Sequence, residues 1–180
     1  MFLNGGNEQV SNITLAEAVK LKSVLTKRIH ELEDEMRRVA FTNVEKGNTP
    51  DQGPRSLKIV ETELDEVRLD SRVLDRLMYR ANIDNEIEFQ GQQLAIVEAI
   101  ELAIQLRAKA RFYKELSMAE KEEIQYGYSE GTVVYRVALF DPEDYRVKSL
   151  QAEKDAHKLS NSINAKNYSI VLKFDDTKYF

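Results

Sequence analysis

Apolar residues recur at alternating steps of three and four in two long segments of this 180-residue chain, which keeps them on one side of a helix. The first segment extends from Thr14 to about Glu45, and the second follows Gly53. A short loop between two such helices predicts an antiparallel coiled-coil hairpin arm over residues 14–82, after a flexible N-terminus at residues 1–13. The repeats are Leu15, Ala18, Lys22, Leu25, Ile29, Leu32, Met36 and Val39, then Leu57, Val60, Leu64, Val67, Ser71, Leu74, Met78 and Ala81.

Three short motifs predict where helices begin. Thr14 and Glu17 form a capping box ahead of the first heptad segment, and Ser117 and Glu120 form a second one ahead of a short helix. Asp141 followed by Pro142 is typical of the start of a further helix. The seven glycines and three prolines fall in a few places between these segments, as expected for long helices.

The remaining segments predict one more long helix and a small β element. Residues 92–116 are helical and apolar nearly all round up to Leu106, so we expect this helix to be buried on several sides. Strands are predicted at about 86–90, 132–140 and 168–174, and the last two pair either parallel or antiparallel. The expected fold is mainly α, with residues 14–180 forming a single helical domain.

Composition excludes several classes of protein. The formal net charge of −5 argues against general nucleic-acid binding, and no apolar run is long enough to span a membrane. The absence of cysteine removes disulfides, thiol nucleophiles and thiolate metal sites. The opening MFLNGGNEQV does not have the pattern of a secretory signal, so we expect a cytoplasmic protein of a bacterial host.

Carboxylates and histidines offer little for catalysis. Asp84, Glu86 and Glu88 alternate along a predicted strand, where they either hold a divalent metal or form the solvated face of an edge strand. His30 and His157 lack a second histidine at zinc-binding spacing and are expected in solvent. The run Glu31, Glu33, Asp34 and Glu35 is expected on a solvated helix face. We therefore assign no catalytic residue, metal ligand or cofactor.

A cationic cluster is the strongest candidate for a ligand site. Arginine forks and tyrosine rings suit a phosphate and its attached base or ribose, while the same residues also serve as charge compensation at a helix end beside core tyrosines. Tyr126 and Tyr128 add further aromatic rings nearby in the sequence. The predicted phosphate-binding residues are Arg107, Lys109, Arg111, Tyr113, Lys114 and Arg136.

Two polar residues interrupt the apolar stripes of the predicted hairpin. Lys22 stands at a stripe position of the first segment and Ser71 at one of the second. A polar residue there either fixes the register of two helices or, for lysine, extends past the seam into solvent.

Three stretches resemble the septicolysin-like family of small bacterial and phage proteins: LAEAVKLKSVLTKRIHELEDEM, NEIEFQGQQLAIVEAIELAIQLRAKARF and the closing VVYRVALFDPEDYRVKSLQAEKDAHKLSNSINAKN. The family's final L-x-x-x-I-x-x-x-N corresponds to Leu159, Ile163 and Asn167. The resemblance covers about residues 14–168, but the spacing before Asp141 and the tail after Asn167 differ. It implies an all-helical coiled-coil hairpin that oligomerises, and it brings no catalytic residues.

We therefore expect a non-enzymatic homo-oligomeric helical protein of bacterial or phage type that acts by binding or assembly. Three alternatives are open. The first is a phage anti-defence protein that sequesters a small nucleotide signal in the cationic cluster. The second is an enzyme that uses a divalent metal on Asp84, Glu86 and Glu88, and the third is a membrane-active toxin.

Overall fold

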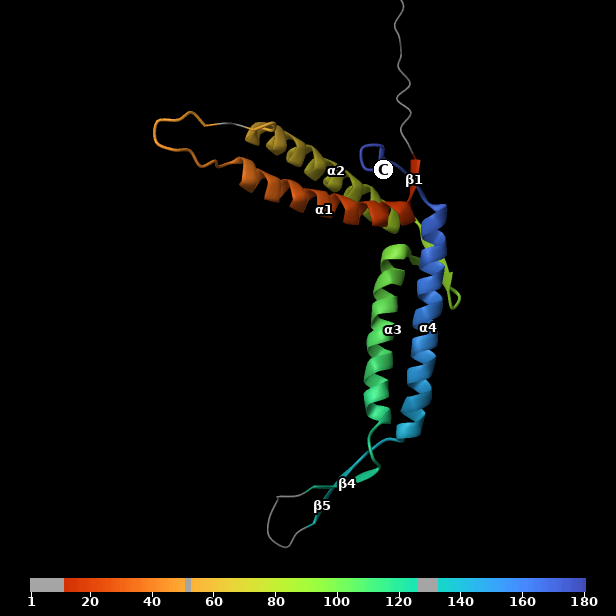
Figure 1. Ribbon diagram of the computed structural model, residues 1–180. Coiled ribbons are helices and arrows are strands. Elements are labelled where there is room, and N and C mark those ends of the chain that lie inside the picture. The colour runs from red at the N-terminus through yellow and green to blue at the C-terminus, as the bar shows by residue number, and fades with distance from the viewer. Residues whose placement is uncertain (1–11, 51–52, 126–132) are drawn as a thin grey trace, which may run out of the picture. The chain divides into compact units, whose positions relative to one another are not determined.

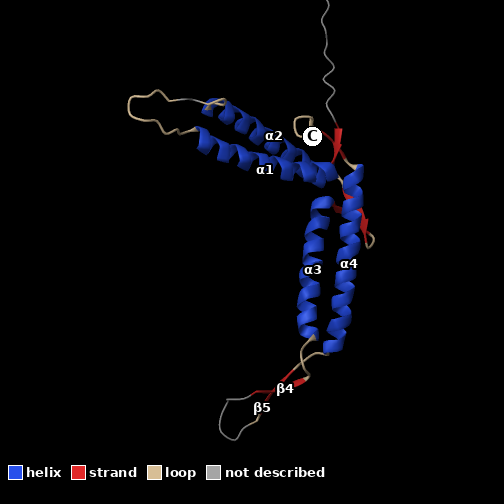
Figure 2. Ribbon diagram, in the orientation of Figure 1, coloured by secondary structure: helices blue, strands red, loops and turns tan. Residues whose placement is uncertain are grey.

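The computed structural model describes residues 12–50, 53–125 and 133–180, which form four helices and six short strands (Figure 1, Figure 2). The fold is mainly helical, as predicted, and its small sheets are all antiparallel. Contacts divide the chain into two compact units: residues 1–84 with 166–180, and residues 85–165. Among the described residues, no helix is both long enough and apolar enough to cross a membrane.

The first unit joins the beginning and the end of the described chain. Strand β1 (Asn12–Thr14) pairs with β6 (Val171–Lys173), and the Leu15 amide donates to the Ile170 carbonyl at 2.8 Å. Helix α1 (Leu15–Val39) follows β1 directly and begins with the predicted capping box: the Glu17 amide donates to Thr14 Oγ1, and the Thr14 amide donates to Glu17 Oε2. Residues 1–11 of the predicted flexible N-terminus lie outside the described residues.

Helices α1 and α2 (Leu57–Asp84) run side by side in opposite directions and pack through the apolar stripes read from the sequence (Figure 1). At the position where the sequence placed Lys22 in the α1 stripe, the neighbouring residue Leu21 is the one that is buried, and it supplies the apolar side chain. Helix α1 ends at Val39, earlier than expected, which leaves the described residues 40–50 and 53–56 outside both helices. The buried residues are Leu15, Ala18, Leu21, Leu25 and Leu32 of α1 and Val60, Leu64, Val67, Leu74 and Ala81 of α2.

The second unit begins with a β-hairpin of β2 (Glu86–Phe89) and β3 (Gln92–Ala95). Gln90 and Gly91 form its two-residue turn with φ of 51° and 79°, as a type I′ turn requires. The prediction of helix from Gln92 was therefore wrong for four residues, since these pair with β2. Helix α3 (Ile96–Ser117) starts only after them, with Glu98 Oε2 accepting from the Ala95 amide.

A second β-ribbon joins α3 to α4 (Pro142–Ser169), whose last four residues belong to the first unit. The ribbon consists of β4 (Glu122–Gln125) and β5 (Val134–Val137) in antiparallel register. The predicted helix after Ser117 was wrong, because Ser117 ends α3 and donates to the Lys114 carbonyl. The predicted strands near 132–140 and 168–174 do not pair with each other, since β5 pairs with β4 and β6 with β1. Asp141 caps α4 as expected, accepting from the Glu143 amide.

The residues buried on α3 and α4 are mainly small. Ser149 Oγ of α4 donates to the Ala110 carbonyl of α3 at 2.8 Å and joins the two helices. The expectation that α3 is buried on several sides was wrong, since only one of its sides is buried. The buried residues are Ile96, Ala99 and Ala103 of α3 and Ser149, Ala152, Ala156, Leu159 and Ile163 of α4.

Candidate interaction surface

Helix α3 exposes an apolar stripe that its fold partners leave uncovered. Val97, Ile100 and Ile104 are 48%, 38% and 52% exposed, although Ala99 and Ala103 on the same helix are buried. The three residues repeat at steps of three and four, so they share one side of the helix, and Ala108 extends that side. A water-exposed row of branched side chains beside buried alanines is typical of a surface that another molecule covers.

The charges flanking this stripe change sign along α3. Glu101 lies beside its first half and accepts a hydrogen bond from Gln105, whereas Arg107 and Arg111 lie beside its second half. Arg111 makes no hydrogen bond or ion pair with another described residue. A helix with this charge order is complementary to a second copy of itself in the antiparallel direction.

The cationic residues predicted to bind a phosphate lie on two different elements of the second unit. Arg107 Nη2 donates to Ser160 Oγ at 2.5 Å, and the Lys109 ammonium lies 5.6 Å from the centre of the Tyr113 ring. Lys114 joins Arg107 and Arg111 on one side of α3, while Lys109 occupies another side with Tyr113. Phosphate binding at α3 stays a prediction.

The sixth residue of the predicted phosphate site lies on the second ribbon. Arg136 on β5 pairs across the ribbon with Glu123 at 3.8 Å and lines a cavity with Phe112, Glu115 and Glu120. Tyr126 and Tyr128 lie outside the described residues.

Tyr113 belongs to a small aromatic cluster where α3 ends and α4 begins. Its ring packs edge-on against Tyr145 at 5.2 Å between ring centres, and Phe140 packs edge-on against Tyr145 at 5.1 Å. The Lys148 ammonium lies 4.6 Å from the centre of the Tyr145 ring. These contacts stabilise the junction of the two helices, with about 0.5–1.5 kcal/mol expected for each aromatic pair.

The carboxylates of residues 84–88 and the two histidines either make local contacts or face solvent, and no ligand is needed to account for their positions. Asp84 accepts from Arg80 one helical turn away at 3.2 Å, and Glu86 and Glu88 are exposed on β2. Within the described part of the chain, no group of three or more histidine, aspartate or glutamate side chains is placed to hold a metal ion. His30 and His157 are exposed, which confirms that expectation.

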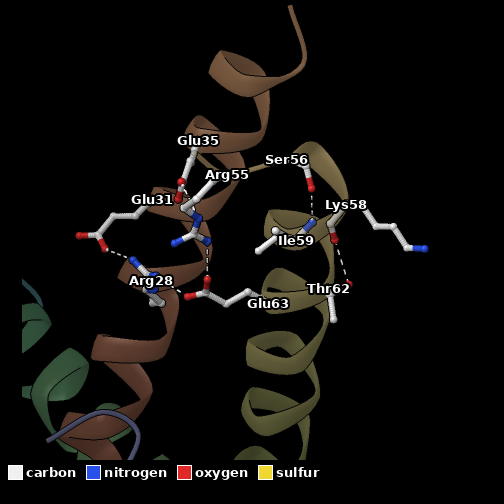
Figure 3. A network of polar contacts seen from close by, with 9 residues as sticks. All are labelled: Arg28, Glu31, Glu35, Arg55, Ser56, Lys58, Ile59, Thr62 and Glu63. Carbon is white, nitrogen blue, oxygen red and sulfur yellow. Dashed lines mark hydrogen bonds and ion pairs between the residues drawn. The ribbon is translucent and has the colours of Figure 1, made fainter. Parts of the chain in front are cut away.

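A network of ion pairs joins α1 to α2 near the loop (Figure 3). Arg55, just before α2, reaches toward α1: its Nε lies 3.1 Å from Glu35 Oε1, and its Nη2 donates to Glu63 Oε2 at 2.5 Å. Arg28 of α1 donates to the other oxygen of Glu63 and lies 3.5 Å from Glu31. Glu63 therefore bridges two arginines from different segments and ties the start of α2 to α1.

This network changes the pKa of its central carboxylate and corrects one expectation. The hydrogen bond from Arg28 holds the pKa of Glu63 below its ordinary value of 4.5, and Arg55 acts in the same direction. Glu33 accepts from Arg68 of α2 at 2.8 Å. The predicted solvated face is thus wrong for Glu33 and Glu35, which pair across the hairpin, and holds for Glu31 and Asp34.

Lys22 lies beside the buried seam and pairs with the opposite helix. Its ammonium is 2.6 Å from Asp75 Oδ1 of α2, and the hydrogen bond that the ammonium donates to this carboxylate raises the pKa of Lys22. The ion pair needs these two positions of α1 and α2 to lie opposite each other, which accords with a role of Lys22 in fixing the register of the two helices. Ser71 is half-buried on α2.

The C-terminal tail crosses α2 within the first unit. The Tyr179 hydroxyl donates to Asp70 Oδ2 at 2.6 Å, and Lys178 lies 3.7 Å from the same oxygen. Burial and the Asp70 carboxylate both raise the pKa of Tyr179, so the phenol is neutral at physiological pH. The sequence contains no motif that predicts this contact, because it joins residues more than a hundred positions apart.

Comparison with known proteins supports the fold. A crystal structure of a functionally unknown conserved protein from Corynebacterium diphtheriae is similar with a TM-score of 0.62 and 24% sequence identity. The similarity covers 90% of this chain and 99% of that protein. No protein-family model and no curated protein matches the chain. The similarity shows that the same fold occurs in a second protein.

Proposed function

We propose that this chain is a non-enzymatic helical protein of bacterial or phage type that assembles with copies of itself through the exposed stripe of α3. The observation that carries the proposal is the reversed burial on this helix, where alanines are buried while Val97, Ile100 and Ile104 face solvent. Fully burying an exposed valine or isoleucine side chain contributes about 1.5–3 kcal/mol, and covering these half-exposed residues contributes about half of that for each. A partner that covers three of them therefore gains a substantial part of the free energy of association.

The charge order of α3 favours a second copy as the partner. In an antiparallel pair related by a two-fold axis, Glu101 of each copy lies near the basic half of the other, where Arg107 and Arg111 stand. The same two arginines belong to the predicted phosphate site, so assembly gives them a role that needs no ligand. The resemblance to septicolysin-like proteins, which implies oligomerisation, accords with this proposal.

We also propose that α1 and α2 form an antiparallel coiled coil. Their buried residues keep the three-and-four spacing over most of the length of both helices. Charged residues flank the seam and pair between the helices, as Lys22 does with Asp75 and Arg68 with Glu33. The seam of this arm is filled by these residues, whereas Val97, Ile100 and Ile104 of α3 stay half-exposed.

Light scattering coupled to size-exclusion chromatography tests the assembly directly. At micromolar concentration we expect a mass that is a multiple of the 20.8 kDa chain, and Ile104→Lys shifts it to the single-chain mass. Ile59→Lys is the matched control, because Ile59 is 54% exposed on α2 and lies outside the stripe. A wild-type protein that elutes as a single 20.8 kDa chain contradicts the proposal.

A further inference from the structure

We propose that the end of α3, together with the β4–β5 ribbon, forms a docking groove for a basic amphipathic segment of a partner protein. The groove is a cavity of about 770 Å³ within the second unit. Its walls come from the last turns of α3, the residues that follow it, β5 and the segment before α4. This surface lies beyond the Val97–Ile104 stripe along α3, so the inference is separate from the proposed assembly.

The walls of the groove expose large apolar side chains. Phe112, Met118 and Leu139 are 56%, 68% and 97% exposed, and each comes from a different part of the fold. Methionine is flexible and adapts to partners of different shape, which suits a surface that receives side chains from another molecule. A molecule that binds in this groove therefore needs apolar groups that cover these side chains.

The rim of the groove is acidic. Glu115, Glu120 and Glu123 line it with a single cation, Arg136, which already pairs with Glu123 at 3.8 Å. Glu115 and Glu120 make no ion pair with another described residue. Among the described residues that line the groove, Glu115 and Glu120 therefore have no counter-charge, and exposed apolar side chains lie beside them.

Charge complementarity selects the chemistry of the occupant. An anionic ligand meets repulsion from the carboxylates, and a purely apolar segment leaves Glu115 and Glu120 beside it without partners. A segment with leucine-like residues on one side and lysine or arginine at its edges covers the apolar side chains of the groove and pairs with the carboxylates at its rim. Helices of this kind dock into apolar grooves by placing their apolar face inward.

A fluorescence anisotropy titration with two synthetic peptides tests the proposal. One peptide combines leucine and lysine at helical spacing, and the other has glutamate at each lysine position. We expect the basic peptide to bind, with affinity that falls as salt is added, and the acidic peptide not to bind. Equal binding of the two peptides, or no binding of the basic peptide up to about 1 mM, overturns the proposal.

Matched variants locate the binding. Leu139→Ser should weaken binding about tenfold, the loss typical of a central interface residue. Glu115→Gln combined with Glu120→Gln should weaken it by about threefold to tenfold, as two exposed ion pairs are lost. The controls Leu150→Ser and Glu153→Gln alter exposed residues of α4 outside the groove and should bind as wild type does. Equal losses in the controls overturn the proposal.

The outcomes separate this proposal from the assembly of α3. Ile104→Lys should change the oligomeric mass and leave peptide binding intact, whereas Leu139→Ser should do the reverse. Loss of self-association in Leu139→Ser, with no binding of the basic peptide to wild type, would assign the groove to a second copy of the chain and overturn the docking of a basic segment.

Discussion

The hairpin of α1 and α2 buries leucines and valines, whereas α3 and α4 meet mostly through alanines and a serine. Large residues fill the space between α1 and α2, and ion pairs such as Lys22 with Asp75 flank that seam. Mainly small residues are buried on α3 and α4, and the branched residues Val97, Ile100 and Ile104 of α3 are left facing water. The two helix pairs thus differ in what they bury: large apolar residues fill the seam between α1 and α2, whereas Val97, Ile100 and Ile104 of α3 stay exposed beside buried alanines.

The largest expected difference in unfolding free energy is between a substitution in the buried seam of α1 and one in the exposed stripe of α3. Leu25 is fully buried in α1, so Leu25→Ala should lower the free energy of unfolding by about 2–5 kcal/mol, through lost burial and the cavity that remains. Ile104→Ala removes a similar volume from an exposed position and should cost less than about 1 kcal/mol in dilute protein. Urea unfolding followed by circular dichroism measures both. Equal costs would mean that α3 is packed as tightly as α1.

A smaller effect tests the packing around Ala103 of α3. Ala103 is buried, so Ala103→Leu should overpack its surroundings and cost about 1–3 kcal/mol of unfolding free energy. Ala108 is exposed on the same helix, and Ala108→Leu should change stability by less than about 0.5 kcal/mol. If the two variants unfold at the same urea concentration, the alanine contact is looser than described.

The smallest effect concerns the ion pairs that join α1 to α2. The folded-state pKa of Glu63 lies below its ordinary value of 4.5, so its pairing stabilises the protein above pH 4.5 and is lost as the pH falls through the lower, folded value. Glu63→Gln should cost about 1 kcal/mol or less at pH 7, because a third of the side chain faces solvent. The difference from wild type should shrink below pH 4.5.

A neighbouring carboxylate provides the control for this pH dependence. Glu61 is exposed on α2 and has no ion pair with another described residue. Urea unfolding of Glu61→Gln should match wild type from acid to neutral pH. A Glu63→Gln curve that runs parallel to wild type at every pH would show that the bridge between Arg28 and Arg55 contributes no stability.

Local signals predicted the first hairpin well. The heptad steps located α1 and α2, and the hydroxyl of Thr14 with the carboxylate of Glu17 fixed the start of α1 because both partners lie within one helical turn. The same reasoning failed at Ser117 and Glu120, which have capping-box spacing. There, pairing of Glu122–Gln125 with β5 decides the structure, and a local motif carries no information about a distant partner.

The candidate surface was harder to predict. The apolar character of α3 was clear from the sequence, but its apolar residues lie nearly all round the helix up to Leu106, so the sequence did not decide which side is buried. Val97, Ile100 and Ile104 follow the three-and-four spacing, which is the signal that could have identified the stripe. The bridge formed by Glu63 joins residues from three segments, and no single spacing reveals it.

The pairing of β1 with β6 has a consequence for the order in which the chain folds during synthesis. Residues 85–165 leave the ribosome as one continuous stretch and can form their unit at once. The first unit is completed later, because Ile170, Leu172 and Phe174, which follow residues 85–165 in the chain, complete its core. Until β6 is made, the apolar residues beside Ile13 and Leu15 are not covered by it. A nascent chain stalled after residue 165 therefore exposes apolar surface that chaperones and proteases bind.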